Sequence, residues 1–286
     1  MRKLRRLKYL PIGAFLTVYF LLILWGWLDI FPRQWREVPP RTIVSQYYPP
    51  SVAHPLGIFF QKDLLISFVK SAPSSFVAGT ITLLPFLVFG ILLGVGSSMK
   101  QGSLQQLCHR LIEIMNAFPK LVVLLIYAAL FGVNIYSLLI LFGIISAPKL
   151  AELIRGKILE LKREDFIDAT IALGLPIRTI VFKHILWYHG RNIVASQIFY
   201  IFAMAVLMEA SLSYLNLGIR YGYYSWGLML HYATSVGHLS FFRWPWHPDF
   251  NLPAVLPSVG LIGLTYCLMY ISRLIQEREM QMKGIL

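Results

Sequence analysis

The sequence predicts an all-α membrane protein with six transmembrane helices and a charged cytoplasmic hairpin of two helices. Hydrophobic residues form 57% of the 286-residue chain and charged residues only 14%, whereas soluble domains carry roughly 25% charge. The apolar residues gather in long runs, and a helix needs about 20 of them to cross about 30 Å of hydrocarbon. Between two such runs lies a charged segment, which must sit in water beside the bilayer.

Six apolar segments meet this requirement. The fourth is short, so we expect its helix to continue into the charged segment. Together they predict one transmembrane domain over 10–271, between an N-terminal cytoplasmic tail (1–9) and a C-terminal cytoplasmic tail (272–286). Three connections are long: an outer segment (31–73), a cytoplasmic loop (149–191) and an outer loop (218–251). The predicted spans are 10–30, 75–96, 110–131, 136–148, 193–217 and 252–271.

Basic residues indicate the orientation, because Lys and Arg are retained on the cytoplasmic side. With both termini inside, 18 Lys or Arg lie on the cytoplasmic side and seven outside. We therefore expect an N-in, C-in topology. The basic start of the chain could suggest a signal peptide, but its apolar run is too long and no small-residue cleavage site follows. We interpret it as a retained anchor.

The net charge of +13 does not indicate nucleic-acid binding, because the basic residues are divided among the ends of the spans. Anionic lipid headgroups account for them better. The chain has two cysteines, Cys108 near the predicted inner surface and Cys267 inside the last span. We expect both to be packing residues and predict no disulfide.

The charged loop contains eight Lys or Arg and five Asp or Glu between Lys149 and Arg191. Within it, a helix is predicted over 164–173, with acidic residues at its start, where the helix dipole favours them. Gly174 ends this helix and Pro176 opens a second one. Four residues at helical spacing form one mostly apolar face: Phe166, Ala169, Thr170 and Leu173. This face could lie on the lipid surface, or it could dock in a groove of a cytoplasmic partner.

The motifs of this loop and of four other segments carry a family resemblance. Arg155-Gly156, Asp165-Phe166-Ile167-Asp168-Ala169, Ala172-Leu173-Gly174 and His184-Ile185-Leu186 resemble the cytoplasmic loop of ABC importer permeases. Other motifs resemble the dipeptide/oligopeptide/nickel transport branch, specifically its second (C-type) permease subunit. They are His54-Pro55-Leu56-Gly57, Ala117-Phe118-Pro119, the run from Glu209 to Gly218, and Ser225-Trp226-Gly227.

The resemblance implies a type I ABC importer permease in the bacterial inner membrane. Its partners would be a second homologous permease subunit, two ABC ATPase subunits, an extracytoplasmic solute-binding protein and membrane lipids. The chain itself would be no enzyme and hold no cofactor, and it has no GxxxxGK[ST] phosphate loop. The implied ATPase-coupling residues are Phe166, Asp168, Ala169, Thr170, Leu173, Gly174 and Arg178. The implied outer-loop contacts are Ser225, Trp226 and Gly227.

The sequence also departs from the family pattern. Asp168 and Thr170 stand where the loop motif usually has Glu and Ala. The Gly-Arg-Asp that commonly follows His-Pro-Leu-Gly is replaced by Gln61-Lys62-Asp63. The resemblance implies import of peptides as the function. Nickel or another small solute is the alternative, since such changes keep the architecture but can alter which substrate is transported.

Glu113, Lys120 and Glu209 fall inside predicted spans, where an unpaired charge costs about 2.5–3.5 kcal/mol on insertion scales. Glu209 lies in the outer half of the fifth span, where it could line a path or bond a neighbouring helix. Glu113 and Lys120 are seven residues apart in the third span and can share a face. Glu113 is expected near headgroups, and Lys120 near the midplane, lining a path, pairing or snorkelling. Proline residues such as Pro119 are expected to kink their helices.

Other function classes find less support. Three histidines of the outer loop (His231, His238 and His247) invite a metal site, but their spacings match no standard motif. Interfacial aromatics with incidental histidines explain this loop better. A secondary transporter would commonly show inverted repeats and intramembrane carboxylates coupled to ions, and a membrane enzyme would need a nucleophile or paired carboxylates at mid-depth. Neither pattern stands out.

Overall fold

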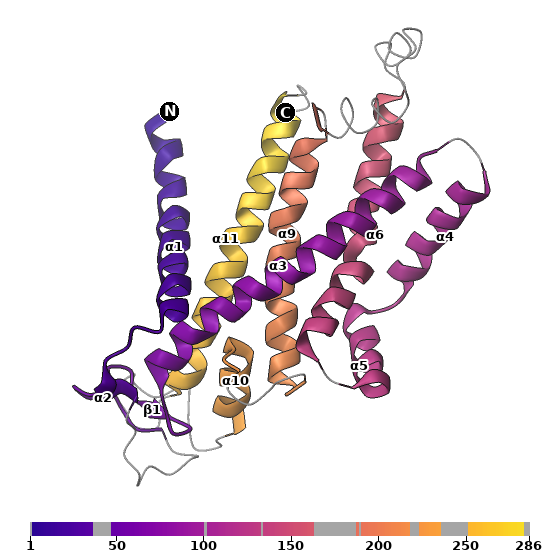
Figure 1. Ribbon diagram of the computed structural model, residues 1–286. Helices are drawn as coiled ribbons and strands as arrows, with labels where there is room; N and C mark the ends of the chain where they lie inside the picture. The colour runs from indigo at the N-terminus through magenta and orange to yellow at the C-terminus, as the bar shows by residue number, and fades with distance from the viewer. Residues whose placement is uncertain are drawn as a thin grey trace. The chain divides into compact units, whose positions relative to one another are not determined.

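A computed structural model describes residues 2–36, 47–99, 102–132, 134–162, 187–188, 190–217, 223–235 and 251–282, with side chains from 11 to 277 in these ranges. Helices dominate (Figure 1). The elements are α1 (Arg2–Leu28), α2 (Arg33–Arg36), β1 (Ile58–Phe59), β2 (Lys62–Asp63), α3 (Leu64–Ser97), α4 (Ser103–Ala117), α5 (Lys120–Phe131), α6 (Ile135–Leu161), α9 (Arg191–Tyr214), α10 (Trp226–Ser235) and α11 (Leu252–Met282).

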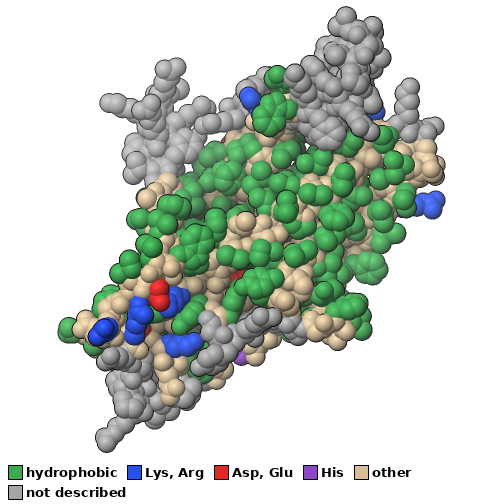
Figure 2. All heavy atoms as spheres, viewed as in Figure 1, with side chains coloured by type: hydrophobic (Ala, Val, Ile, Leu, Met, Phe, Trp, Pro, Cys, Tyr) green, Lys and Arg blue, Asp and Glu red, His purple; other side chains and the backbone are tan. Residues whose placement is uncertain are grey.

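Among these described residues, five helices are long and apolar enough to cross a membrane, and the bent pair α4 and α5 raises the number to six. Hydrophobic side chains cover most of the long helices on the face shown in Figure 2. The predicted helical membrane protein is thereby confirmed. The fourth span also continues into the charged loop as predicted, because α6 runs from Ile135 to Leu161.

Two helices extend beyond the predicted spans. Helix α3 begins at Leu64, inside the predicted outer segment 31–73, and α11 continues to Met282, into the predicted tail 272–286. Hydropathy marks where a chain is apolar, not where helical hydrogen bonding stops. At the start of α3 the decisive signal is a cap, because Asp63 Oδ1 accepts a hydrogen bond from the backbone N of Ile66 at 2.9 Å.

The third predicted span is broken. Helices α4 and α5 meet at an angle of 88°, and Figure 1 shows the sharp turn between them. The linking residue Phe118 has extended backbone angles, and Pro119 stands at the N-cap of α5. Proline has no N–H to donate and disfavours helical angles in the residue before it. The predicted kink is therefore a full break.

The chain divides into two compact units. Unit 1 comprises Met1–Gly79, Val133–Ile135 and Val206–Cys267, and unit 2 comprises Thr80–Gly132, Tyr136–Ala205 and Leu268–Leu286. Both Cys108 and Cys267 are free and buried, which agrees with the predicted packing role.

Within unit 2, two glycines let α3 approach α6 closely. A Cβ added to Gly90 would lie 2.7 Å from Leu150, and one added to Gly94 would lie 2.9 Å from the carbonyl oxygen of Ala151. Spacing of two small residues by four positions is typical of close helix contacts in membranes. One face of α4 completes this core through Cys108 and Ile112.

Within unit 1, α1 packs on the first half of α3. The hydroxyl of Tyr19 donates a hydrogen bond to the carbonyl of Ala72 at 3.2 Å. Gly26 faces Pro73 with no room for a side chain, since a Cβ there would lie 2.8 Å from the proline ring. These contacts anchor the first span to the helix whose start carries the candidate site.

Candidate functional site

All seven predicted ATPase-coupling residues lie outside the described residues: Phe166, Asp168, Ala169, Thr170, Leu173, Gly174 and Arg178. The described structure reaches the near end of their loop. Helix α6 ends at Leu161, and the Lys162 ammonium donates to the carbonyl of Ser98 at 2.6 Å. The end of α6 is thereby tied to the end of α3 within unit 2.

Glu113 and Lys120 do not share the helix face that their spacing allowed, because the helix is broken between them. The break at Pro119 puts Glu113 on α4 and Lys120 at the first position of α5. Glu113 is exposed and pairs with His109, whose Nε2 lies 3.3 Å from its carboxylate. Helical periodicity relates two residues only while the helix is continuous.

Lys120 is half-buried in unit 2. Its ammonium lies 5.9 Å from the centroid of the Phe142 ring on α6. This distance is at the outer limit of a cation–π contact. The Lys120 side chain therefore lies against an aromatic ring of the neighbouring helix α6.

Glu209 is fully buried in unit 1. Its Oε1 accepts hydrogen bonds from the Ser213 hydroxyl at 2.8 Å and the Tyr223 hydroxyl at 3.2 Å. The Ser225 hydroxyl also interacts with this carboxylate, while Oε2 makes no hydrogen bond of normal geometry with a described residue. Of the two expected roles, the contacts favour bonding between segments, since Glu209 ties α9 to the chain that leads into α10.

The predicted outer-loop contacts Ser225, Trp226 and Gly227 lie inside unit 1. All three are buried. Ser225 caps α10, because its Oγ accepts a hydrogen bond from the backbone N of Gly227 at 3.1 Å. Trp226 stacks on Phe68 with ring centroids 5.3 Å apart and donates its indole N–H to the Phe68 carbonyl at 3.1 Å.

Gly227 allows α10 to rest directly on α9. A Cβ at this position would lie only 2.0 Å from the carbonyl oxygen of Ala210. No side chain fits there without moving backbone. The Ser-Trp-Gly motif therefore has a clear structural role in this chain: a cap, a buried anchor and a point of closest approach.

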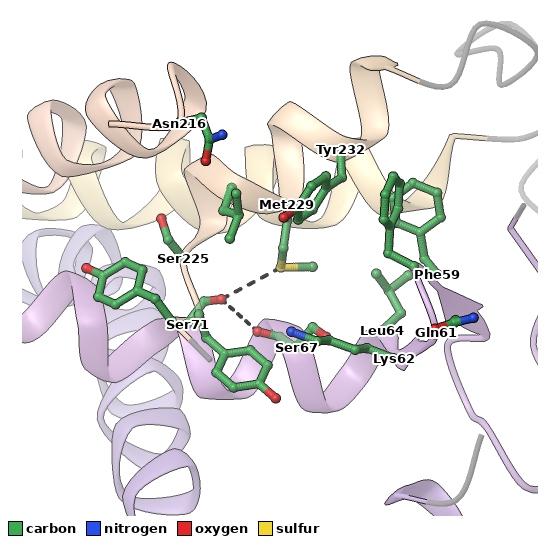
Figure 3. Close-up of a pocket in the computed structure, with 14 residues that line it drawn as sticks. Phe59, Gln61, Lys62, Leu64, Ser67, Ser71, Asn216, Ser225, Met229 and Tyr232 are labelled. Carbon is green, nitrogen blue, oxygen red and sulfur yellow. Dashed lines mark hydrogen bonds between the residues drawn. The ribbon is translucent and has the colours of Figure 1, made fainter. Parts of the chain in front are cut away.

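The arrangement of α3, α10 and the β1–β2 hairpin leaves a cavity of about 550 Å³ in unit 1. Small-molecule sites commonly have volumes of about 300–1,000 Å³. Figure 3 shows Ser67 and Ser71 of α3 on one wall, facing Met229 and Tyr232 of α10. None of the described residues that line the cavity is acidic.

The wall from α3 presents two hydroxyl groups. Ser67 Oγ donates to the carbonyl of Asp63 at 2.9 Å, and Ser71 Oγ donates to the carbonyl of Ser67 at 2.7 Å. Ser71 Oγ also lies 3.8 Å from Met229 Sδ. Each hydroxyl thus has a backbone carbonyl as acceptor, and its oxygen keeps lone pairs that can accept further hydrogen bonds.

The hairpin wall carries an unusual turn. Phe60 and Gln61 join the two strands, and both have positive φ, 50° and 54°. Such turns normally contain Asn or Gly, because side chains disfavour this conformation. Strained backbone of this kind is enriched at functional sites. The strain brings Phe60 against Tyr232 of α10, with stacked rings whose centroids are 4.3 Å apart.

Lys62 follows this turn and provides a cation at the cavity. Its ammonium lies 4.7 Å from the centroid of the Tyr224 ring, and Lys70 approaches the same ring at 5.4 Å. Partial burial lowers the pKa of Lys62 below its usual value, and the Lys70 charge lowers it further. A nearby anion would offset both effects.

The hairpin is held in place by a buried pair. His54 Nδ1 lies 3.0 Å from Asp63 Oδ2, while the other oxygen of Asp63 caps α3. One carboxylate therefore links the segment before the hairpin to the helix after it. This contact gives His54 of the His-Pro-Leu-Gly motif and Asp63 a shared structural role.

Asn216 closes the cavity from the end of α9. Its φ is 59°, in the left-handed region, and its neighbour Leu217 donates a backbone hydrogen bond to Leu212 at 2.9 Å. Asn is one of the few non-glycine residues that commonly ends a helix in this way. The side chain of Asn216 lines the cavity.

Sequence reasoning missed the cavity and its cation. Lys62 was visible only as a departure from the family pattern, and nothing in the sequence brings it near Tyr224. Of the three histidines considered for metal, His231 lies on α10 and its ring packs edge-on to Tyr214. The other two lie outside the described residues, and among the described residues no group of three metal-ligating side chains is found.

Comparison with known proteins gives a consistent result. Residues 86–281 match the family described as "Binding-protein-dependent transport system inner membrane component". The chain is 30% identical, over 71% of its length, to the oligopeptide transport system permease protein OppC of Haemophilus influenzae, of which the match covers 64%. It is 27% identical to the dipeptide transport system permease protein DppC of Alkalihalophilus pseudofirmus, with 92% and 85% of the two chains covered.

Another relative is named for a different substrate. The glutathione transport system permease protein GsiD of Pectobacterium atrosepticum is 30% identical, with 65% of this chain and 62% of that protein covered. The matches to OppC and GsiD thus span less than two thirds of those relatives.

Proposed function

Because the chain belongs to the family of binding-protein-dependent transport system inner membrane components, we propose that it is a permease subunit of an ABC importer for short peptides. The observation that carries the peptide assignment is the set of names of its relatives. They are permeases for oligopeptides, dipeptides and glutathione, and all three substrates are short peptides.

The proposed assembly contains this chain, a second homologous permease, two ABC ATPase subunits and an extracytoplasmic solute-binding protein. ATP hydrolysis takes place in the ATPase subunits. In this assembly the chain lies in the bacterial inner membrane with both termini in the cytoplasm, as its distribution of Lys and Arg indicates. Lys120 is the proposed path-lining residue on α5.

The proposed coupling element is the helix predicted over 164–173. Its apolar side chains Phe166, Ala169 and Leu173 would fill a groove on an ATPase subunit, as amphipathic helices do in other complexes. Gly174 would form the turn that lets this helix project. The long, partly charged α6, which continues past its apolar part to Leu161, supports a rigid connection to this loop.

The proposed function is tested by ATP hydrolysis of the reconstituted complex with its binding protein and a peptide. Leu173→Asp places a charge in the contact, and truncation of a central interface residue commonly costs about 2 kcal/mol or more. We expect this variant to lose peptide-stimulated hydrolysis, while Leu173→Met keeps it. Gly174→Val should also lose it, because a β-branched residue resists positive φ.

Two results would contradict the proposal. If the wild-type complex shows neither peptide uptake nor peptide-stimulated hydrolysis, the peptide importer assignment is wrong. If it transports peptide and Leu173→Asp does so equally well, the importer assignment stands and the coupling role of this helix is wrong. Membrane insertion of each variant is measured in parallel.

A further inference from the structure

We propose that the cavity between α3, α10 and the β1–β2 hairpin binds the carboxyl-terminal end of a short peptide. This inference rests on the proposed function and names a site for its substrate within unit 1. Three properties of the cavity carry it: a cation without an acidic neighbour in the described lining, an aromatic wall, and hydroxyl oxygens with free lone pairs.

The cation selects for an anion. Lys62 is held against the face of Tyr224 at 4.7 Å, and Lys70, the second cation near this ring, already pairs with Asp29 at 2.8 Å. No carboxylate among the described residues lies within salt-bridge distance of Lys62, and no described lining residue is acidic. A ligand carboxylate would provide the missing counter-charge at the rim.

The aromatic wall selects for an apolar body attached to that anion. Phe60 and Tyr232 stack at 4.3 Å, and Phe59 meets Phe60 edge-on at 4.9 Å. Leu228 and Met229 continue the apolar surface and are largely buried. This surface suits an aliphatic or aromatic side chain next to the carboxylate.

The α3 wall selects for N–H donors. Ser67 and Ser71 donate to backbone carbonyls, and while these hydrogen bonds are kept their oxygens act toward a ligand as acceptors. The amide N–H groups of a peptide are such donors. An anion, an apolar side chain and N–H donors occur together at the end of a peptide with a free carboxylate.

The walls of the cavity are also held in place by internal contacts. Such preorganisation favours binding, because little conformational entropy is lost when a ligand binds. Glu209 accepts the hydrogen bond of Tyr223, and Gly227 locks α10 against α9. The His54–Asp63 contact holds the hairpin. Glu209 is thus a positioning residue for the cavity and not a ligand contact.

The test uses the complete importer complex in nanodiscs of phosphatidylcholine and the tripeptide Ala-Ala-benzoylphenylalanine. Its photoreactive ring marks its neighbours. We expect crosslinks in the β1–β2 hairpin or α10 for the free acid and much weaker labelling for the C-terminal amide. Uptake of the same peptide by wild type is measured in parallel in proteoliposomes of the same lipid.

Variants test the cation and the aromatic wall separately. Lys62→Met should weaken binding of the free acid by about fivefold, as for one exposed charge pair, and leave the amide unchanged. Arg33→Met is the matched control, because it removes an exposed positive charge of unit 1 that does not line the cavity, and it should change neither. Tyr232→Ala should weaken both ligands and Tyr232→Phe neither.

The outcomes are distinguishable. Uptake of the peptide with crosslinks only outside the cavity, or with Lys62→Met binding the free acid normally, refutes the inference and leaves the proposed function intact. An anionic phospholipid retained at the cavity in wild type, lost in Lys62→Met and undisturbed by peptide, assigns the site to lipid and also refutes it. Absence of any peptide uptake by wild type refutes the proposed function and this inference together.

Discussion

At the scale of single residues, the buried carboxylate of Glu209 has the clearest consequence. Two hydroxyl groups, from Ser213 and Tyr223, donate to one of its oxygens. A buried hydroxyl that loses its acceptor costs about 1–3 kcal/mol. Glu209 therefore contributes to stability more as a hydrogen-bond acceptor for these hydroxyl groups than through its charge.

We expect Glu209→Leu to lower the unfolding temperature of the purified chain clearly, because it removes the oxygen that accepts hydrogen bonds from Ser213 and Tyr223. Glu209→Gln keeps an oxygen at the position of Oε1 and should be much less harmful. Thermal unfolding in detergent compares the two variants. Equal stability of the Leu and Gln variants would contradict the bonding role.

Gly227 supports a second prediction. An added methyl group would collide with the Ala210 carbonyl, which is backbone and cannot swing away. We expect Gly227→Ala to cost about 1–3 kcal/mol through overpacking. Gly156→Ala is the matched control, because that helical glycine has no atom within 4 Å of the added carbon and should be neutral or stabilising by up to about 1 kcal/mol. Thermal unfolding decides, and equal effects would contradict the close approach.

At the scale of elements, a small charged cluster connects the end of α1 to α3. The Asp29 carboxylate lies 2.8 Å from the Lys70 ammonium and 3.7 Å from Arg36. Chiefly the hydrogen bond from Lys70, and also the charges of Lys70 and Arg36, hold the pKa of Asp29 below its usual value of 3.8. A carboxylate with a lowered pKa in the folded state stabilises that state at pH values above its ordinary pKa. This contribution is lost as the pH falls through the folded-state value.

We therefore expect Asp29→Asn to lower the unfolding temperature by about 1–3 °C at pH 7, a small effect because the pair is partly exposed. The difference from wild type should shrink as the pH falls below 3.8. Glu277→Gln, which also removes an exposed negative charge, is the control. A difference between wild type and Asp29→Asn that is independent of pH would contradict the ion pair.

The elements also show what the hydrophobic pattern can and cannot predict. It identified the apolar segments, because each membrane-spanning helix needs apolar side chains along its length. It failed between Glu113 and Lys120, where the helix turns by 88°. A proline predicts a disturbance there, but the size of the bend depends on what α4 and α5 pack against. The start of α3 was missed for a similar reason, because its cap is a contact of Asp63 with backbone and not a change in hydropathy.

At the scale of the whole molecule, the orientation in the membrane can be tested directly. The charge asymmetry predicts that cysteines introduced at Ser45 and Ser240 react with an impermeant thiol reagent in intact cells, whereas one at Lys162 does not. The background replaces Cys108 and Cys267, both of which are buried. Labelling at Lys162 from outside, with none at Ser45, would reverse the proposed topology.

The sequence by itself determined the helical membrane class, the order of the spans and the family. Each follows from local properties: long apolar runs, charge between them, and short motifs read residue by residue. These properties need no partner elsewhere in the chain, because the cost of placing polar groups in hydrocarbon applies to each segment separately.

Only the tertiary structure decided what the polar residues do. It buried Ser225 and Trp226, which the sequence suggested as outer contacts, and it paired Glu209 with Tyr223. It also assembled one cavity from the hairpin at Lys62, the start of α3 and α10. The hairpin and the start of α3 lie more than 150 positions before α10, as in the contact between Ser71 and Met229. The physical reason is that packing and hydrogen bonding join residues by their distance in space, which no local pattern encodes.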